Sequence, residues 1–164
     1  MLLTYNVLLY MFDHILEKLP YGPSFCFVDN IYELNENGIC GDYTLKTDAS
    51  FYEGHFKGYP VTPGVILTEI MAQIGLVAFG IYIIDGMSAD EQEKDGHPLF
   101  PLLTSTNVSF YKMVLPGQKV SVISKKEYFR FNKLKCSVEM FDEANELIAT
   151  GVFAGIIGKI NTKR

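Results

Sequence analysis

A nearly continuous apolar run from Gly64 to about Ile84 constrains the fold more than any other feature of this sequence. Thr62 and Pro63 precede the run and predict a helix start, because threonine can cap a helix and proline suits its first turn. About twenty helical residues span roughly 30 Å. Since this helix is apolar on every side, it either crosses a membrane or is enclosed by other parts of the chain.

The C-terminal half favours the enclosed helix, because it reads as strands with one apolar face that needs cover. Four strand-like segments are separated by turn-like segments such as 131–133 and 142–145. The predicted fold is α+β, with an antiparallel sheet wrapped around one long buried central helix at about 64–84 and a C-terminal β-meander at about 104–158. In the third strand-like segment, apolar side chains alternate with polar ones, as in a strand with one buried face: Leu134, Cys136, Val138 and Met140.

The N-terminal segment, about residues 1–19, has helical spacing near its end and stops before Pro20, so it predicts a short helix. It has no basic start and no small-residue cleavage site, and we expect a docking segment instead of a signal peptide. The three cysteines form no CxxC pair and predict neither a disulfide framework nor a metal site. A reducing cytoplasm is therefore the expected location.

Residues 24–34 and 39–47 are rich in aromatic and β-branched residues and predict two strands joined by a turn at 35–38. Residues 86–101 are charged and rich in glycine and proline, and predict an exposed loop. With 164 residues, 48% of them hydrophobic, and no internal repeat, the chain is expected to form one domain, residues 1–164. The formal net charge of −5 argues against a nucleic-acid partner, and no membrane partner is expected.

A few polar groups in and near the apolar run form the candidate site. Glu69 lies in a helix predicted to be buried, where a carboxylate is costly unless it is paired or protonated, so it could act as an acid. Gln73, one turn later, is placed to hydrogen-bond Glu69. His55, fourteen residues before Glu69, can act as base or acid. The N–H groups of Gly64 and Val65 at the helix start would suit an anionic oxygen.

Each of these features also has a simpler explanation. A histidine beside glycines is more often a loop residue, and a single glutamate in an apolar helix often touches solvent at a dimer seam. The prolines and glycines of 58–64 could form only a turn. The conjunction of base, acid and anion-binding helix end within about twenty residues favours an active site.

The segment GHFKGYPVTPGVILTEIMAQ, residues 54–73, resembles the signature of the 3-hydroxyacyl-acyl-carrier-protein dehydratases of the hotdog fold. In that family a GHFPG-x-P-x-x-PG-V segment leads into a helix with an acidic residue and a MAQ tripeptide. LPYGPSFCFVDNI and SFYKMVLPGQKV also resemble family segments, so the likeness covers roughly residues 12–157. Glu69 and Ala72 resemble the Z-type branch, whereas the A-type branch, which also isomerises the double bond, usually has an aspartate and a tryptophan there.

The chain departs from the family pattern at three places. Tyr21 and Gly22 stand where the family commonly has a histidine and an arginine, Lys57 replaces a proline, and Gln118 replaces an aspartate. None of these changes removes a catalytic group. The wording YPVTPGVILTE also resembles dehydratases that accompany aryl-polyene and flexirubin-type pigment synthesis.

The resemblance implies dehydration of a (3R)-hydroxyacyl chain on the phosphopantetheine of an acyl carrier protein to the trans-2-enoyl thioester, with no metal or organic cofactor. His55 would take the proton beside the thioester carbonyl, and Glu69 would act on the 3-hydroxyl. Gly64 and Val65 would bind the enolate oxygen. Family members place the histidine and the acid on different protomers, which implies a homodimer or higher oligomer, or a hetero-oligomer with another hotdog subunit. The supporting residues would be Gln73 and Pro63.

The candidates for an acyl tunnel are Phe79, Phe110 and Tyr111, although for any single one of them a plain core position is at least as good an explanation. Half of the 14 basic residues lie in one sheet region. They could steer an acidic carrier protein, or could form a solvated sheet face. These residues are Lys112, Lys119, Lys125, Lys126, Arg130, Lys133 and Lys135.

Two other functions stay open at this point. A hotdog acyl thioesterase would use a water nucleophile and release a free acid. A non-catalytic acyl-binding hotdog subunit would leave the thioester unchanged. His55 and Glu69 together speak against the non-catalytic subunit, because nothing structural requires both.

Overall fold

The structure is a computed structural model that describes residues 11–94 and 97–159. Its strands form a sheet in the order β1-β2-β5-β6-β7-β4-β3, in which all neighbours are antiparallel. The strands are β1 (Asn30–Asn35), β2 (Gly38–Thr44), β3 (Glu93–Lys94), β4 (His97–Phe110), β5 (Lys119–Arg130), β6 (Lys133–Asp142) and β7 (Leu147–Lys159).

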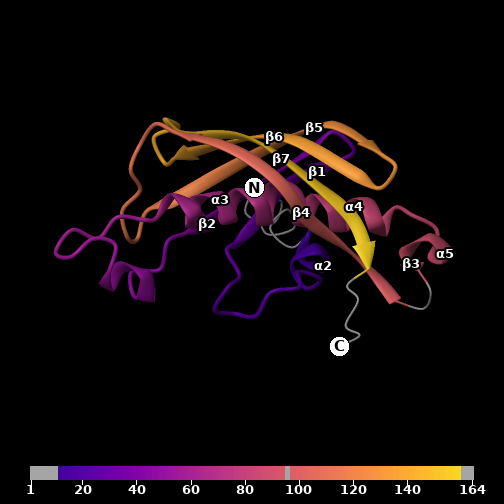
Figure 1. Ribbon diagram of the computed structural model, residues 1–164, viewed down its shortest axis with the longest axis horizontal. Coiled ribbons are helices and arrows are strands. Elements are labelled where there is room, and N and C mark those ends of the chain that lie inside the picture. Colours follow the sequence, from indigo (N-terminus) through magenta and orange to yellow (C-terminus); the bar gives the residue numbers. More distant parts are fainter. Residues whose placement is uncertain (1–10, 95–96, 160–164) are drawn as a thin grey trace, which may run out of the picture.

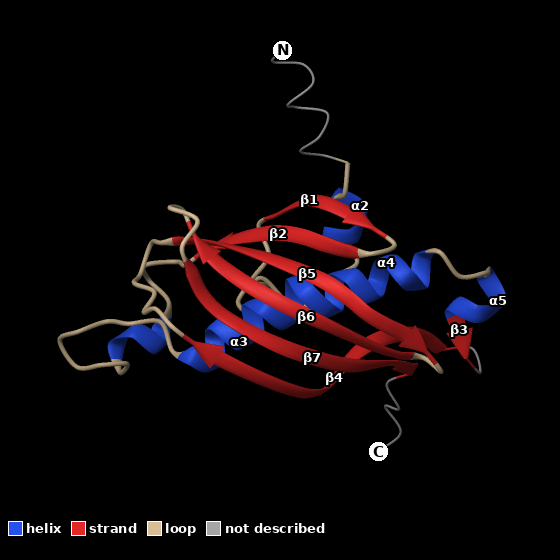
Figure 2. Ribbon diagram, turned by 90° about the horizontal axis from the view of Figure 1, so that it is seen from above, coloured by secondary structure: helices blue, strands red, loops and turns tan. Residues whose placement is uncertain are grey.

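One long helix lies beneath this sheet. Figure 1 shows the strands as a curved layer on one side of the helix, and Figure 2 shows them crossing over it. It consists of α3 (Gly64–Ala72), a π-helical segment (Gln73–Ala78) and α4 (Phe79–Asp85). The predicted architecture of an antiparallel sheet around one long helix is therefore confirmed. The other helical elements are α2 (Asp13–Leu16), a 3₁₀ turn (Ser50–Glu53) and α5 (Ala89–Gln92).

The central helix is the centre of the hydrophobic core. Ile70, Ile74 and Phe79 are fully buried, and the alternating apolar residues of β6 pack into the same cluster. By length and composition alone this helix could cross a membrane, but 72% of its most apolar window is buried inside the fold. Enclosure by the sheet accounts for its apolar surface.

Two glycines let the helix approach the sheet closely. A Cβ on Gly75 would lie 3.0 Å from the side chain of Val138, and one on Gly80 would lie 2.6 Å from that of Pro101. The Ser124 hydroxyl of β5 donates a hydrogen bond of 2.7 Å to the Gly75 carbonyl in the π-helical segment. The helix is thus fixed to the sheet by tight packing and by a buried polar contact.

The predicted strand at 24–34 begins later than expected, because β1 starts only at Asn30. Two backbone groups before it bond to a side chain: the Phe27 N–H donates to Gln73 Oε1, and Gln73 Nε2 donates to the Phe25 carbonyl. Only the Asp29 N–H, directly before β1, donates to β2 among the described residues of this segment, at the Asp42 carbonyl. This segment and α2 lie on the side of the helix away from the sheet (Figure 1). α2 is shorter than the predicted N-terminal helix, whose residues 1–10 lie outside the described residues.

The predicted loop at 86–101 is also wrong over its last part, since β4 already begins at His97. β4 pairs with β7 along its length, and among the described residues only the two-residue β3 pairs with its other edge. An edge strand tolerates proline, because one side of its backbone needs no ladder bond. Pro101 is buried against Gly80 of the central helix, so covering the helix outweighs the turn-like composition.

Candidate active site

His55 lies two residues after the 3₁₀ turn Ser50–Glu53. The connection from this turn to α3 projects beyond one end of the sheet (Figures 1 and 2). The Nδ1 of His55 lies 2.8 Å from the Val61 carbonyl oxygen. A carbonyl can only accept, so Nδ1 carries the proton of the neutral ring and Nε2 keeps its lone pair. The Val61 N–H donates back to the His55 carbonyl at 2.9 Å, and the ring stacks on Phe56 with centroids 4.0 Å apart. The half-buried imidazole is therefore oriented as a base by its own loop.

Glu69 is held by Gln73, as the four-residue spacing predicts. Gln73 Nε2 donates to Glu69 Oε1 at 2.9 Å. The amide cannot be flipped, because its Oε1 must accept from the Phe27 N–H and its Nε2 must donate to the Phe25 carbonyl. Gln73 is fully buried, whereas Glu69 is half-buried and less enclosed than the sequence suggests. Glu69 Oε2 accepts no hydrogen bond from the described residues.

The start of α3 presents free amides, but it is not capped as predicted. Pro63 occupies the N-cap position, and the Thr62 hydroxyl lies 2.6 Å from the Tyr52 hydroxyl instead. The Gly64 and Val65 N–H groups have no hydrogen-bond acceptor among the described residues. These two amides at the positive end of the helix can therefore receive an anionic oxygen.

The structure brings His55, Gly64 and Glu69 to the same end of the fold without joining them. No hydrogen bond or ion pair within 11–94 and 97–159 links His55 to Glu69. The base, the acid and the anion site are each oriented, but the described chain does not close them into one cleft.

Large apolar side chains are exposed at this same end. The Thr62 N–H donates to the Val114 carbonyl at 2.8 Å, and the Phe110 ring lies against Gly64, so the two connections that carry these side chains are adjacent. We call them the apolar end surface, and each is at least 45% exposed: Phe56, Tyr59, Val65, Phe110, Tyr111, Met113 and Leu115. A patch of this kind on a folded chain marks an interaction site.

The three tunnel candidates separate in the structure. Phe79 is fully buried and stacks near Tyr82 with ring centroids 6.4 Å apart, which is a core position. Phe110 and Tyr111 belong to the apolar end surface beside Gly64.

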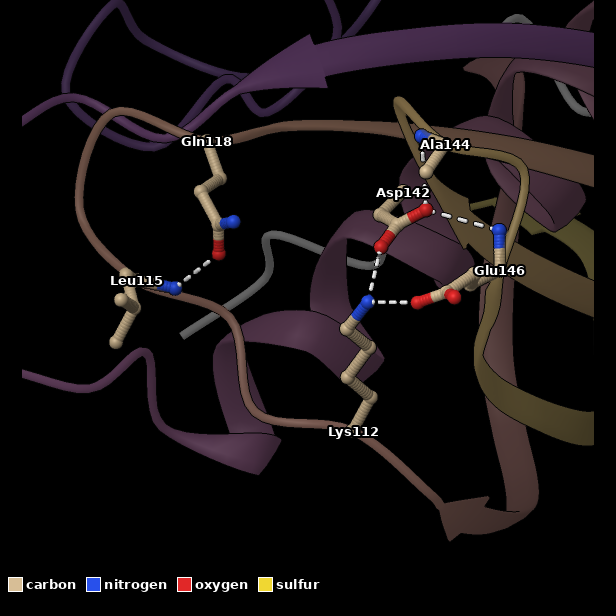
Figure 3. A network of polar contacts seen from close by, with 6 residues as sticks. All are labelled: Lys112, Leu115, Gln118, Asp142, Ala144 and Glu146. Atoms are coloured by element: carbon tan, nitrogen blue, oxygen red, sulfur yellow. Dashed lines mark hydrogen bonds and ion pairs between the residues drawn. The ribbon is translucent and has the colours of Figure 1, made fainter.

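The basic residues proposed for carrier docking do not form one free patch. Lys112 is paired with Asp142 and Glu146 (Figure 3). Lys126 borders a cavity of about 400 Å³ with Tyr82 at the C-terminal end of the helix. The remaining members are spread along β5 and β6: Lys119 pairs with Asp42, Lys135 pairs with Glu127, Arg130 lies over the Tyr128 ring, and Lys125 and Lys133 are exposed.

An antiparallel sheet curved around one long helix is the hotdog fold. Thioesterase superfamily member 2 from zebrafish has this fold with a TM-score of 0.60 at 13% identity, covering 93% of this chain and 97% of its own. A chain of the dehydratase heterocomplex ApeI:P from Xenorhabdus doucetiae gives a TM-score of 0.63 at 14% identity, covering 90% and 91%. At these identities the likeness shows the fold alone.

Sequence similarity is more specific. Residues 19–143 match the family model described as the FabA-like domain, and the chain belongs to this family. The 3-hydroxyacyl-[acyl-carrier-protein] dehydratase FabZ of Acinetobacter baylyi is 32% identical over 124 residues, which cover 72% of this chain and 78% of that protein. The FabZ of Syntrophobacter fumaroxidans is 31% identical over 150 residues, covering 92% and 95%.

Proposed function

We propose that the protein dehydrates a 3-hydroxyacyl thioester carried on an acyl carrier protein to the 2-enoyl thioester, in fatty-acid synthesis. The membership of the FabA-like family and the FabZ relatives support this activity. The observation that carries it at the site is the orientation of His55 and Glu69 by two separate, non-titrating partners, the Val61 carbonyl and the Gln73 amide. The enzyme is then a hydro-lyase.

In the proposed mechanism, the free Nε2 of His55 takes the proton from C2 of the acyl chain. The electron pair of the C2–H bond forms the C2–C3 double bond while the C3–O bond breaks. Glu69 gives its proton to the departing hydroxyl, which leaves as water. The N–H groups of Gly64 and Val65 donate hydrogen bonds to the thioester oxygen and stabilise the negative charge that develops on it as the C2–H bond breaks.

We propose that this site is completed by a second hotdog chain, in a homodimer. The absence of a His55–Glu69 contact within the described residues supports this arrangement, and so does the apolar end surface around Gly64. β4 also leaves most of one edge unpaired in the described chain, and an exposed edge can pair with a second strand. A partner with a different hotdog sequence is the alternative that the test below distinguishes.

The acyl carrier protein is the proposed partner that delivers the substrate, and the mechanism uses no metal or organic cofactor. Lys126 would serve its docking if the partner chain's helix runs antiparallel beside this one, because it borders the cavity at the C-terminal end of the central helix. Arg130 lies further along the same strand, whereas Lys125 lines a different cavity, with Ser137. Lys112 is less suited, since two carboxylates already neutralise it.

The test is incubation with a 3-hydroxyacyl carrier-protein thioester, read by mass spectrometry. We expect loss of one water with the wild type and no reaction with His55→Ala or Glu69→Gln. Release of free acid would indicate a thioesterase, and an unchanged but bound thioester would indicate a non-catalytic subunit. Neither result is compatible with the proposal.

Co-expression of the two inactive variants tests the shared site. If His55 and Glu69 act across a dimer, the mixed dimers contain one intact site, and about a quarter of the wild-type activity returns. If both residues act within one chain, the mixture stays inactive. A wild type that needs a different hotdog chain for any activity would contradict the homodimer.

A further inference from the structure

The loop that carries His55 is exposed between two buried ends. Tyr52 and Thr62 are buried, whereas every residue of 53–61 between them is half-buried or exposed. In the described chain, all hydrogen bonds of residues 53–61 stay within 51–61. These hydrogen bonds shape the loop, but they do not attach it to the sheet or to the central helix.

The two ends of the loop are joined by a buried hydroxyl pair, Tyr52 and Thr62. Their hydroxyl oxygens lie 2.6 Å apart, which is a hydrogen-bond distance. Burial raises the pKa of the Tyr52 phenol by more than this hydrogen bond lowers it, so the pair stays neutral and bonded near neutral pH. The Thr62 N–H also donates to the Val114 carbonyl at 2.8 Å, which fixes this end of the loop to the connection between β4 and β5.

The hydroxyl pair therefore closes the loop at its base, directly before the start of α3. We propose that Tyr52 and Thr62 are positioning residues whose hydrogen bond holds the His55 loop against the start of the central helix. This inference rests on the proposed dehydration, in which Nε2 of His55 must reach C2 of the acyl chain. Opening the pair would leave the imidazole chemically intact but less precisely placed, and small displacements of a catalytic group are costly in rate.

The kinetic test removes the two hydroxyls one at a time and together. Tyr52→Phe and Thr62→Val nearly keep the side-chain shapes, and we expect each to lower kcat about tenfold with little change in KM. The double variant should fall no further, because after one loss the second hydroxyl has no partner in the pair. Thr62→Ser keeps a hydroxyl and should keep the wild-type kcat.

Ser124→Ala is the matched control for stability. It also removes one buried hydroxyl hydrogen bond, to the Gly75 carbonyl at 2.7 Å, but outside the His55 loop. We expect a fall of its urea midpoint similar to that of Tyr52→Phe, with the wild-type kcat. An equal loss of kcat in both variants would mean that kcat only follows stability, and would overturn the inference.

A second readout reports the His55 ring without any activity. The chain has three histidines, and the ¹⁵N resonances of His55 are assigned by their loss in His55→Ala. At about pH 9, where an imidazole is neutral, wild-type His55 should carry its proton on Nδ1, because the Val61 carbonyl accepts it. In Tyr52→Phe the looser loop should let part of the population carry the proton on Nε2, so the two nitrogen shifts should move toward each other. His14 and His97 should not respond.

Three further results would each overturn the inference. These are wild-type kcat in both single variants, a double variant whose loss is the product of the two single losses, and unchanged His55 nitrogen shifts in Tyr52→Phe. A fall of kcat in Thr62→Ser as large as that in Thr62→Val would also contradict it. If the wild type dehydrates nothing, the proposed function fails, whereas the His55 nitrogen shifts still test the hydroxyl pair.

Discussion

Replacing Gln73 by leucine tests how the candidate acid is built into the core. Leucine fills most of the same space and removes all three hydrogen bonds of the fully buried amide: to the Phe27 N–H at 2.7 Å, the Phe25 carbonyl at 2.9 Å and Glu69 at 2.9 Å. The buried Phe27 N–H would lose its acceptor, which costs up to about 3 kcal/mol. The Phe25 carbonyl and Glu69 would each lose the hydrogen bond that Gln73 Nε2 donates, and each loss adds about 1 kcal/mol or less. We expect Gln73→Leu to destabilise the fold by about 4 kcal/mol, a large part of a typical domain stability.

Urea denaturation at fixed protein concentration, followed by circular dichroism, measures this change. Fixed concentration matters because association adds to apparent stability. With a slope of about 2 kcal/mol per molar urea, the midpoint should fall by about 2 M. Ser124→Ala is the matched control, because it removes one buried hydrogen bond, to the Gly75 carbonyl, and should cost only about 1 kcal/mol.

The comparison between the two variants decides the argument. A Gln73→Leu midpoint within about 0.5 M of wild type, or a smaller fall than that of Ser124→Ala, would refute the view that this amide anchors the segment at Phe25–Phe27. Other contacts would then hold the segment at Phe25–Phe27, and the orientation of Glu69 would need another explanation.

Two further perturbations test packing and charge. Gly80→Ala should lower the thermal midpoint by about 5 °C, because its Cβ would lie 2.6 Å from Pro101, whereas Gly86→Ala at the helix end, 3.5 Å from the nearest atom, should have little effect. The hydrogen bond from Lys112 lowers the pKa of Asp142, so this pair stabilises the fold at neutral pH and loses its contribution as the pH falls through that lowered pKa. Lys112→Met should therefore lower the urea midpoint at neutral pH but not at about pH 2, and an equal loss at both pH values would contradict this account.

The features that follow from local spacing could be predicted from the sequence. The apolar run after Pro63 gave the central helix, because its length and uniform apolarity leave few alternatives. The Glu69–Gln73 hydrogen bond follows from residues four apart on one helix face. Both depend on neighbours within one or two helical turns, so no knowledge of the tertiary fold is needed.

The errors arise where distant residues compete for the same group. Residues 24–29 have strand-like composition, but the Phe25 carbonyl and the Phe27 N–H bond to the Gln73 amide, more than forty residues away, instead of to a strand. The Thr62 hydroxyl could cap the helix, but it lies against Tyr52 instead. In the sequence Lys112 has no evident partner, but in the fold it pairs with Asp142, which is thirty residues later. Secondary-structure propensity alone cannot show which of these possible hydrogen-bond partners a group will take, because the choice depends on the tertiary fold.

The difference between local and distant contacts also explains how the candidate site is organised. His55 is oriented by the carbonyl of its own loop, and Glu69 by an amide on its own helix, so neither depends on the other for its geometry. Both partners are groups that do not titrate, so each orientation is kept as the site passes protons. In the proposed two-chain site, association would therefore change only the distance between groups that are already oriented. Binding energy from the apolar end surface, which borders the Gly64 amide, would then serve to bring groups that are already oriented into one site.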